Sequence, residues 1–165
     1  MITKLENPLS DSYYALKELV KSDTFPWYKN KADATTPDFF SHKLLSRPGG
    51  GEPHLFPTAA SEYLRGFAEL LYSVWDHNDI KVNCIYRMNI NLVLPSNTDT
   101  HSPPHVDHKF PHKNLIMYLT DAGGDTVVND EVYSPNEDDV ITFTGLHYHH
   151  FPKKDARIVF VATYI

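Results

Sequence analysis

Residues 80–165 alternate short apolar runs with turn-forming residues, and this pattern constrains the fold more than any other feature of the chain. The strand-like runs are IKVNCIYRMNINLVLP, NLIMYLT, TVVND, EVYS, VITFTG, HYHHF and RIVFVATYI. The segments between them, such as SNTDTHSPP, DAGGD and SPNEDD, are rich in proline, glycine, asparagine and aspartate, which favour turns. About eight short strands in this order predict an antiparallel barrel or jelly roll.

The N-terminal part of the chain carries the helical patterns. Residues 10–22 begin with serine and aspartate, which favour helix caps, and then repeat apolar residues at helical spacing. Residues 58–79 carry a longer apolar stripe, and we expect Thr58 to cap this second helix. Between the two helices, residues 24–30 and 38–47 are rich in aromatic residues and predict a pair of strands.

Length and composition indicate a single globular domain. The 165 residues fit one domain, in which residues 1–79 support a core barrel of residues 80–165. The net charge of −6, without a dense Lys/Arg cluster, disfavours nucleic acid as a partner. No run approaches the roughly 20 apolar residues of a membrane span, and no targeting pattern is visible at the start. Because the single cysteine, Cys84, is typical of a reducing compartment, we expect a cytoplasmic protein.

A histidine and an aspartate with metal-ligand spacing stand before these last strands. His105 and Asp107 are separated by one residue, and in an extended chain such residues point to the same face, where both can reach one ion. A third ligand would come from the segment DDVITFTGLHYHH, which holds His147, His149 and His150. Two histidines and a carboxylate form the facial triad that suits non-haem Fe(II) with open coordination positions.

The order of these motifs resembles that of the Fe(II)/2-oxoglutarate-dependent dioxygenases, and most closely the prolyl-4-hydroxylase-like subgroup with its small phage and bacterial members. The resemblance rests on His-x-Asp, the strand LIMYLT, GGDT, VITFTG before a histidine, and a later arginine, within about residues 80–165. It implies a mainly β double-stranded β-helix, a jelly-roll barrel, with the two N-terminal helices buttressing it. For a phage-encoded member, the expected location is the host cytoplasm.

The resemblance also implies the iron ligands. His105 and Asp107 match the first two. For the third, the family places an aromatic-x-Gly turn before the ligand and an arginine after it, a pattern that His149 in FTGLHYH fits best. His147 shares the strand phase of His149 and stays as an alternative, whereas His150 would turn away from a site that His149 faces.

Two residues are implied for the cosubstrate. Arg157 begins the last predicted strand, and the resemblance implies that its guanidinium binds the distal carboxylate of 2-oxoglutarate. Tyr118 in LIMYLT matches a tyrosine that donates a hydrogen bond to the same carboxylate. The alternative for Arg157 is an exposed charge at a strand edge, paired with Asp155 or Asp125.

Further polar residues are candidates for contacts in the site. Asn89 and Asn91 alternate with apolar residues, and Arg87 lies on the same strand face. Asn89 is our candidate for contact with the cosubstrate, while a solvent-facing strand side is the alternative. His108 and His112 flank KFP just after the first ligands; we interpret them as solvated loop histidines, with the substrate entrance as the alternative.

The resemblance implies a hydroxylase that uses Fe(II), 2-oxoglutarate and O2, with ascorbate as an optional addition, and that releases succinate and CO2. A prolyl residue of a peptide or protein is the expected substrate, with an amino acid or another small molecule as alternatives. A nucleobase is disfavoured by the acidity of the chain. Two other classes stay open: a cupin-like barrel that holds Ni, Mn or Zn without 2-oxoglutarate, and a non-catalytic binding module on the same fold.

Overall fold

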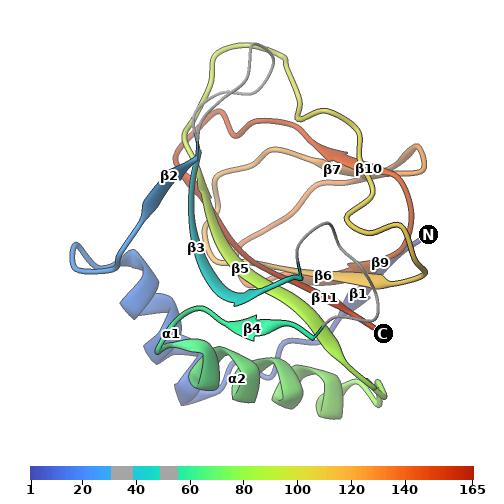
Figure 1. Ribbon diagram of the computed structural model, residues 1–165. Helices are drawn as coiled ribbons and strands as arrows, with labels where there is room; N and C mark the ends of the chain where they lie inside the picture. The colour runs from blue at the N-terminus through green and yellow to red at the C-terminus, as the bar shows by residue number, and fades with distance from the viewer. Residues whose placement is uncertain (31–38, 49–55) are drawn as a thin grey trace.

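The computed structural model describes residues 1–30, 39–48 and 56–165. Two β-sheets face each other, and two helices cover the outer face of the larger sheet (Figure 1). In chain order the elements are β1 (Ile2–Leu5), α1 (Asp11–Lys21), β2 (Tyr28–Asn30), β3 (Phe39–Ser46), β4 (Thr58–Ala59), α2 (Leu64–His77), β5 (Ile85–Val93), β6 (Lys113–Tyr118), β7 (Thr126–Val128), β8 (Glu131–Tyr133), β9 (Val140–Phe143), β10 (His147–His149) and β11 (Arg157–Tyr164).

The larger sheet has the strand order β1-β9-β6-β11-β5-β3-β2, with β4 paired to β3, and the smaller sheet has the order β10-β7-β8. All of these pairs are antiparallel. The expected jelly-roll barrel with two buttressing helices is therefore confirmed. Seven strands, β5 to β11, lie in residues 80–165, where the sequence predicts about eight.

The central strands of the larger sheet separate the core from the space between the two sheets. Along β11, Phe160 and Ala162 are fully buried beneath the helices, and Phe160 lies opposite Ile90 of β5 and Met117 of β6. The ring of Phe160 packs 5.1 Å from that of Phe67 in α2. Because strand side chains alternate between faces, most of the intervening residues of β5, β6 and β11 point into the space between the two sheets.

Helix α1 agrees with its sequence pattern, whereas α2 begins later than predicted. The Ser10 side chain accepts a hydrogen bond from the Tyr13 N–H, as an N-cap does. Thr58 does not cap α2: Thr58 and Ala59 form β4 and pair with β3, and α2 starts at Leu64 without a side-chain cap. Strand pairing with β3 thus overrides the local preference of a threonine for a helix cap.

The N-terminal strand β1 was not expected from the sequence. Ile2 to Leu5 pair with β9, from Ile2 opposite Phe143 to Leu5 opposite Val140. A run of four residues is too short to show a period. The predicted strand pair of residues 24–30 and 38–47 is found as β2 and β3, although β2 has only three residues; Asp38 lies outside the described residues.

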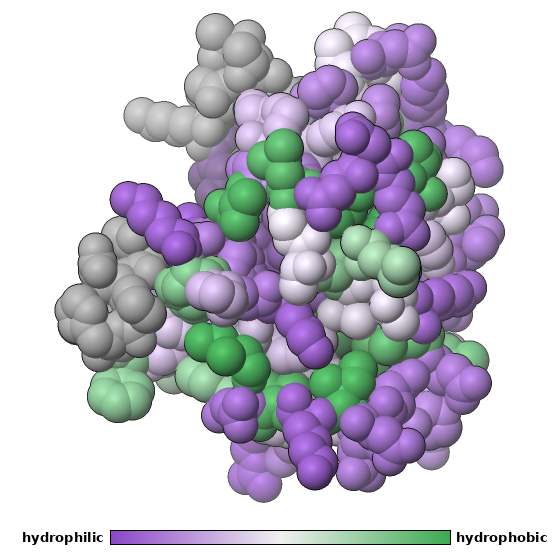
Figure 2. Space-filling model, turned by 90° about the vertical axis from the view of Figure 1, so that its right-hand side faces the viewer, coloured by the Kyte–Doolittle hydropathy of each residue, from purple (hydrophilic) through white to green (hydrophobic). Residues whose placement is uncertain are grey.

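Within the residues that the structure describes, neither helix is both long and apolar enough to cross a bilayer. On the face shown in Figure 2, apolar side chains form small patches among polar ones.

Candidate functional site

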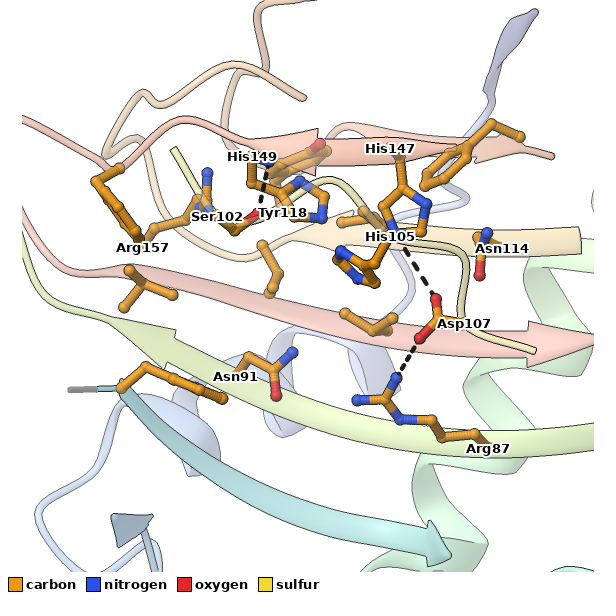
Figure 3. Close-up of a pocket in the computed structure, with 17 residues that line it drawn as sticks. Arg87, Asn91, Ser102, His105, Asp107, Asn114, Tyr118, His147, His149 and Arg157 are labelled. Carbon is orange, nitrogen blue, oxygen red and sulfur yellow. Dashed lines mark hydrogen bonds and ion pairs between the residues drawn. The ribbon is translucent and has the colours of Figure 1, made fainter. Parts of the chain in front are cut away.

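A cavity of about 190 Å³ lies between the two sheets. Its floor comes from alternate residues of β5, β6 and β11, and its roof comes from β10 and the loop that contains Ser102, His105 and Asp107. Figure 3 shows Arg157 and Tyr118 at one end of this cavity, Asp107 and Arg87 at the other, and His105 and His147 between them.

The structure brings His105, Asp107 and His147 together. One candidate ligand atom from each residue lies within 4.8 Å of the others. The backbones of His105 and His147 exchange two hydrogen bonds, of 2.9 and 3.0 Å, which join the loop to β10. The Nε2 atom of His147 is 3.7 Å from Oδ2 of Asp107. The buried His147 and the exposed His105 therefore face one carboxylate across a space for an ion.

The hydrogen bonds of both imidazoles suit a metal site. The Nδ1–H of His105 donates to the Pro103 carbonyl at 2.9 Å, and the Nδ1–H of His147 donates to the Gly145 carbonyl at 3.1 Å. A hydrogen bond at one ring nitrogen fixes the tautomer and leaves the lone pair of the other nitrogen for a metal. Burial and the neighbouring His105 lower the pKa of His147, which keeps it neutral as a ligand must be. These residues fit a divalent transition metal.

His149 lies beside this group and is not part of it. Its Nδ1 shares a 2.9 Å hydrogen bond with the Thr126 hydroxyl, which in turn is 2.7 Å from the Tyr118 hydroxyl. Burial and the positive charge of Arg157 hold the pKa of His149 well below its usual value. The geometry favours His147 over His149 as third ligand. His150 does not line the cavity; its backbone pairs with that of His101.

Arg157 is buried at the far end of the cavity, with 5% of its surface exposed. Its Nη1 donates to the carbonyls of Gly124 at 2.9 Å and His150 at 3.0 Å, while its buried Nε has no partner. The alternative of an exposed charge paired with an aspartate is wrong, because the side chain is buried and no ion pair joins it to a described carboxylate. A buried guanidinium without a counter-charge suits an anionic ligand.

The hydroxyl of Tyr118 points to the same end of the cavity. Burial raises the pKa of Tyr118 to about 12, so the phenol keeps its proton and remains a donor. Its partner Thr126 is fully buried in β7 and was missed from the sequence, because a threonine in a β-branched run has the ordinary composition of a strand. Ser102 was missed for a similar reason: it lies in a polar loop, and its hydroxyl accepts a 3.0 Å hydrogen bond from the His149 N–H.

The polar residues of β5 differ in whether they line the cavity. Arg87 lines the cavity and places Nη1 2.6 Å from Oδ1 of Asp107. Asn89 is buried but does not line the cavity; with its amide assigned so that the oxygen faces Arg87, it accepts a 2.9 Å hydrogen bond from Nη2 of Arg87. Asn91 does line the cavity, as does Asn114 of β6, and both have buried amide atoms without a partner among the described residues. These unpaired atoms can bind a polar ligand or water.

The carboxylate of Asp107 is held ionised. Burial alone would raise the pKa of Asp107, but the positive charge of Arg87, with smaller contributions from the nearby histidines, holds it below its usual value. The carboxylate can therefore act as an anionic ligand near neutral pH.

His108 and His112 are not solvated, so that interpretation was wrong. They are 5% and 8% exposed, and they pack with Phe110 and Tyr86 in an aromatic cluster. Burial lowers the pKa of His108 to about 4, and its Nε2 lies 2.8 Å from the Thr163 hydroxyl. Neither histidine lines the cavity.

No protein-family model and no curated protein sequence matches the chain. Solved structures do resemble it. An oxidoreductase of the 2OG-Fe(II) oxygenase family from Burkholderia pseudomallei is 18% identical, with a TM-score of 0.75, over 99% of this chain and 84% of that one. A prolyl hydroxylase from Trichoplax adhaerens, in complex with a hypoxia inducible factor peptide fragment, is 10% identical, with a TM-score of 0.64, over 99% and 83%.

The epimerase SnoN, in complex with Fe3+, alpha ketoglutarate and nogalamycin RO, is 12% identical, with a TM-score of 0.61, over 99% of this chain and 78% of that one. At these identities the likeness shows the fold. The chain has the fold of the 2-oxoglutarate-Fe(II) oxygenases, which confirms the predicted double-stranded β-helix.

Proposed function

We propose that this protein is an Fe(II)- and 2-oxoglutarate-dependent dioxygenase that hydroxylates an unactivated C–H bond. The observation that carries the proposal is the convergence of His105, Asp107 and His147 in a cavity whose far end holds the buried Arg157, which has no counter-charge among the described residues. Two imidazoles and one carboxylate leave coordination positions open for a bidentate ligand and O2. A cationic group at the end of the cavity supplies the anchor that a dicarboxylate needs.

The residues of the chain have distinct roles in this proposal. His105, Asp107 and His147 would hold the metal, with His147 in the position that the sequence pattern assigned to His149. Arg157 and Tyr118 would bind the distal carboxylate of 2-oxoglutarate. His149, bonded to Thr126 between these groups, would form the cavity wall against the cosubstrate. Bound iron would supply the oxidative chemistry that couples conversion of 2-oxoglutarate to succinate and CO2 with hydroxylation.

The proposed activity leaves the substrate to be assigned. Proteins of the same fold include a prolyl hydroxylase solved with a peptide and an epimerase solved with nogalamycin RO. We propose a prolyl residue of a peptide as the first candidate and a small molecule as the second. Proline-containing peptides and free amino acids can be compared directly by mass spectrometry, since hydroxylation adds one oxygen atom.

The test of the activity uses purified protein without oxygen. Addition of Fe(II) and then 2-oxoglutarate should produce a visible metal-to-ligand charge-transfer band, and admission of air should produce succinate. The variants His105→Ala and Asp107→Ala should lose both signals, whereas His77→Ala, on the surface beside Glu6, should keep them. Substitution of His147 and His149 in turn identifies the third ligand, since only loss of the true ligand removes metal binding.

The outcome separates the alternatives. If the protein takes up metal but develops no charge-transfer band with 2-oxoglutarate, and Arg157→Ala leaves its activity unchanged, it is a cupin-like metal protein and not a dioxygenase. No metal uptake at all would leave only a binding module on this fold.

A further inference from the structure

The two carboxylate oxygens of Asp107 have different partners. Oδ2 faces the Nε2 atom of His147 at 3.7 Å, and Oδ1 lies 2.6 Å from Nη1 of Arg87 (Figure 3). The Asp107 side chain is 7% exposed and that of Arg87 is 21% exposed. One oxygen is therefore directed to the candidate metal position, while the other is bonded on the opposite side.

Arg87 is itself held in place. It lies on β5 opposite Thr163 of β11, on the face that lines the cavity. Its second nitrogen, Nη2, donates to the amide oxygen of Asn89 at 2.9 Å. Arg47 donates a 2.8 Å hydrogen bond to the backbone carbonyl of Asp107. This contact helps to hold the loop that carries Asp107. Each of the two Nη atoms of Arg87 therefore has one partner in a planar group of fixed geometry.

We propose that Arg87 is a positioning residue that restricts Asp107 to binding the metal through Oδ2 alone. A carboxylate can bind a metal ion through one oxygen or two. A second bond from Oδ1 would occupy one of the positions that the keto acid and O2 require. This inference rests on the proposed function, because it concerns the same metal site.

The alternative is a simple ion pair, in which Arg87 only balances a negative charge. The two explanations differ in what a lysine can replace. Lysine keeps the charge but contacts a carboxylate as a single flexible point, without the planar pair of nitrogens that joins Asp107 to Asn89. Arg87→Lys therefore keeps the positive charge but loses the fixed geometry of the guanidinium, and Arg87→Gln loses both.

The first measurement is metal affinity, with Co(II) alone as the probe, by calorimetry. We expect Arg87→Gln to bind Co(II) about 10- to 100-fold more weakly than the wild type, as is usual when a residue that orients a ligand is lost, and Arg87→Lys to lie between them. The matched control is Arg65→Gln, which removes an exposed arginine paired with Glu69 on α2 and should bind Co(II) as the wild type does. The visible spectrum of the bound Co(II) reports its coordination, which a merely structural role of Arg87 would not change.

The second measurement is 2-oxoglutarate binding at saturating Fe(II) without oxygen. If Oδ1 is free to bind the metal, the keto acid must compete for a position. Both Arg87 variants should then need at least about tenfold more 2-oxoglutarate to develop the charge-transfer band. Thermal unfolding of the metal-free variants is recorded first; if Arg87→Gln is unfolded, Arg87→Lys carries the test.

The outcomes are distinguishable. Wild-type affinities and spectra in Arg87→Gln would overturn the inference, and so would full recovery of both by Arg87→Lys, because charge alone would then suffice. A wild-type protein that binds Co(II) no better than His105→Ala would refute the proposed function itself, and the role of Arg87 with it.

Discussion

Gly124 shows how a single residue can shape the end of the cavity that holds Arg157. Its φ is +88°, and a Cβ atom there would lie 2.7 Å from the His150 carbonyl oxygen and 2.9 Å from Nη1 of Arg157. Its carbonyl also accepts a hydrogen bond from that same nitrogen. The sequence pattern indicated that the GGDT glycines serve a turn. The structure adds that Gly124 leaves the space in which Arg157 lies.

We expect Gly124→Ala to weaken 2-oxoglutarate binding about tenfold or more, because the new methyl group displaces the guanidinium. The measurement is titration of the charge-transfer band in the presence of Fe(II). Gly123→Ala is the matched control: its φ is also positive, at +69°, but a Cβ there meets nothing within 4 Å. Both variants carry a similar backbone strain of about 1–2 kcal/mol. Equal 2-oxoglutarate affinities in the two variants would contradict the role given to Gly124.

At the scale of elements, Asp139 joins β1 to the rest of the barrel. It forms an ion pair with Lys4 of β1 at 2.6 Å, and its other oxygen accepts hydrogen bonds from the Tyr133 hydroxyl at 2.7 Å and the Asn136 N–H at 2.9 Å. Burial alone would raise the pKa of Asp139, but these contacts outweigh it and hold the pKa below its usual value.

A lowered pKa in the folded state makes stability depend on pH in a defined direction. The unfolded state takes up the proton first, so the contribution of Asp139 is complete above the unfolded pKa of about 4 and is lost as the pH falls through the lower folded value. We expect Asp139→Asn to lower the free energy of unfolding by about 1–3 kcal/mol at pH 7, and less at pH 3. Urea unfolding at both values measures the difference. A loss that stays constant with pH would show that the charge is not responsible.

At the scale of the whole molecule, the proposed metal site lies where the two segments that form the roof of the cavity pair with each other. The loop before β6 pairs with β10 and the residue that follows it through two isolated bridges, His105 with His147 and His101 with His150. One of these bridges carries two of the proposed ligands. Metal binding should therefore stabilise the folded barrel as a whole, since an ion that binds only the folded state shifts the unfolding equilibrium.

We expect Co(II) at about 100 times its Kd to add about 2.7 kcal/mol of stability, which for a chain of this size raises the Tm by about 5–10 °C. Differential scanning fluorimetry with and without a chelator measures the shift. His77→Ala should keep the shift and His105→Ala should lose it. An equal shift in both variants would place the ion elsewhere in the protein.

The sequence by itself determined the features that depend on near neighbours in the chain. Helix α1 follows from apolar spacing after a capping serine, and the central strands follow from alternation. The turn before β7 follows from the glycines of DAGGD, since Gly123 and Gly124 both adopt positive φ, which glycine tolerates best. The pairing of His105 with Asp107 in one motif belongs to the same category, because only one residue lies between them and their side chains can meet without any distant contact.

Only the tertiary structure decided what depends on partners far away in the chain. His147 and His149 share one strand phase, so alternation cannot choose between them; the backbone bridge to His105 places His147 nearer to Asp107. Asn89 shares a strand face with Arg87 but contacts Arg87 rather than the cavity. Thr58 became part of a strand because β3 offered its backbone a partner. In each case the local pattern allowed two outcomes, and contacts between distant segments selected one of them.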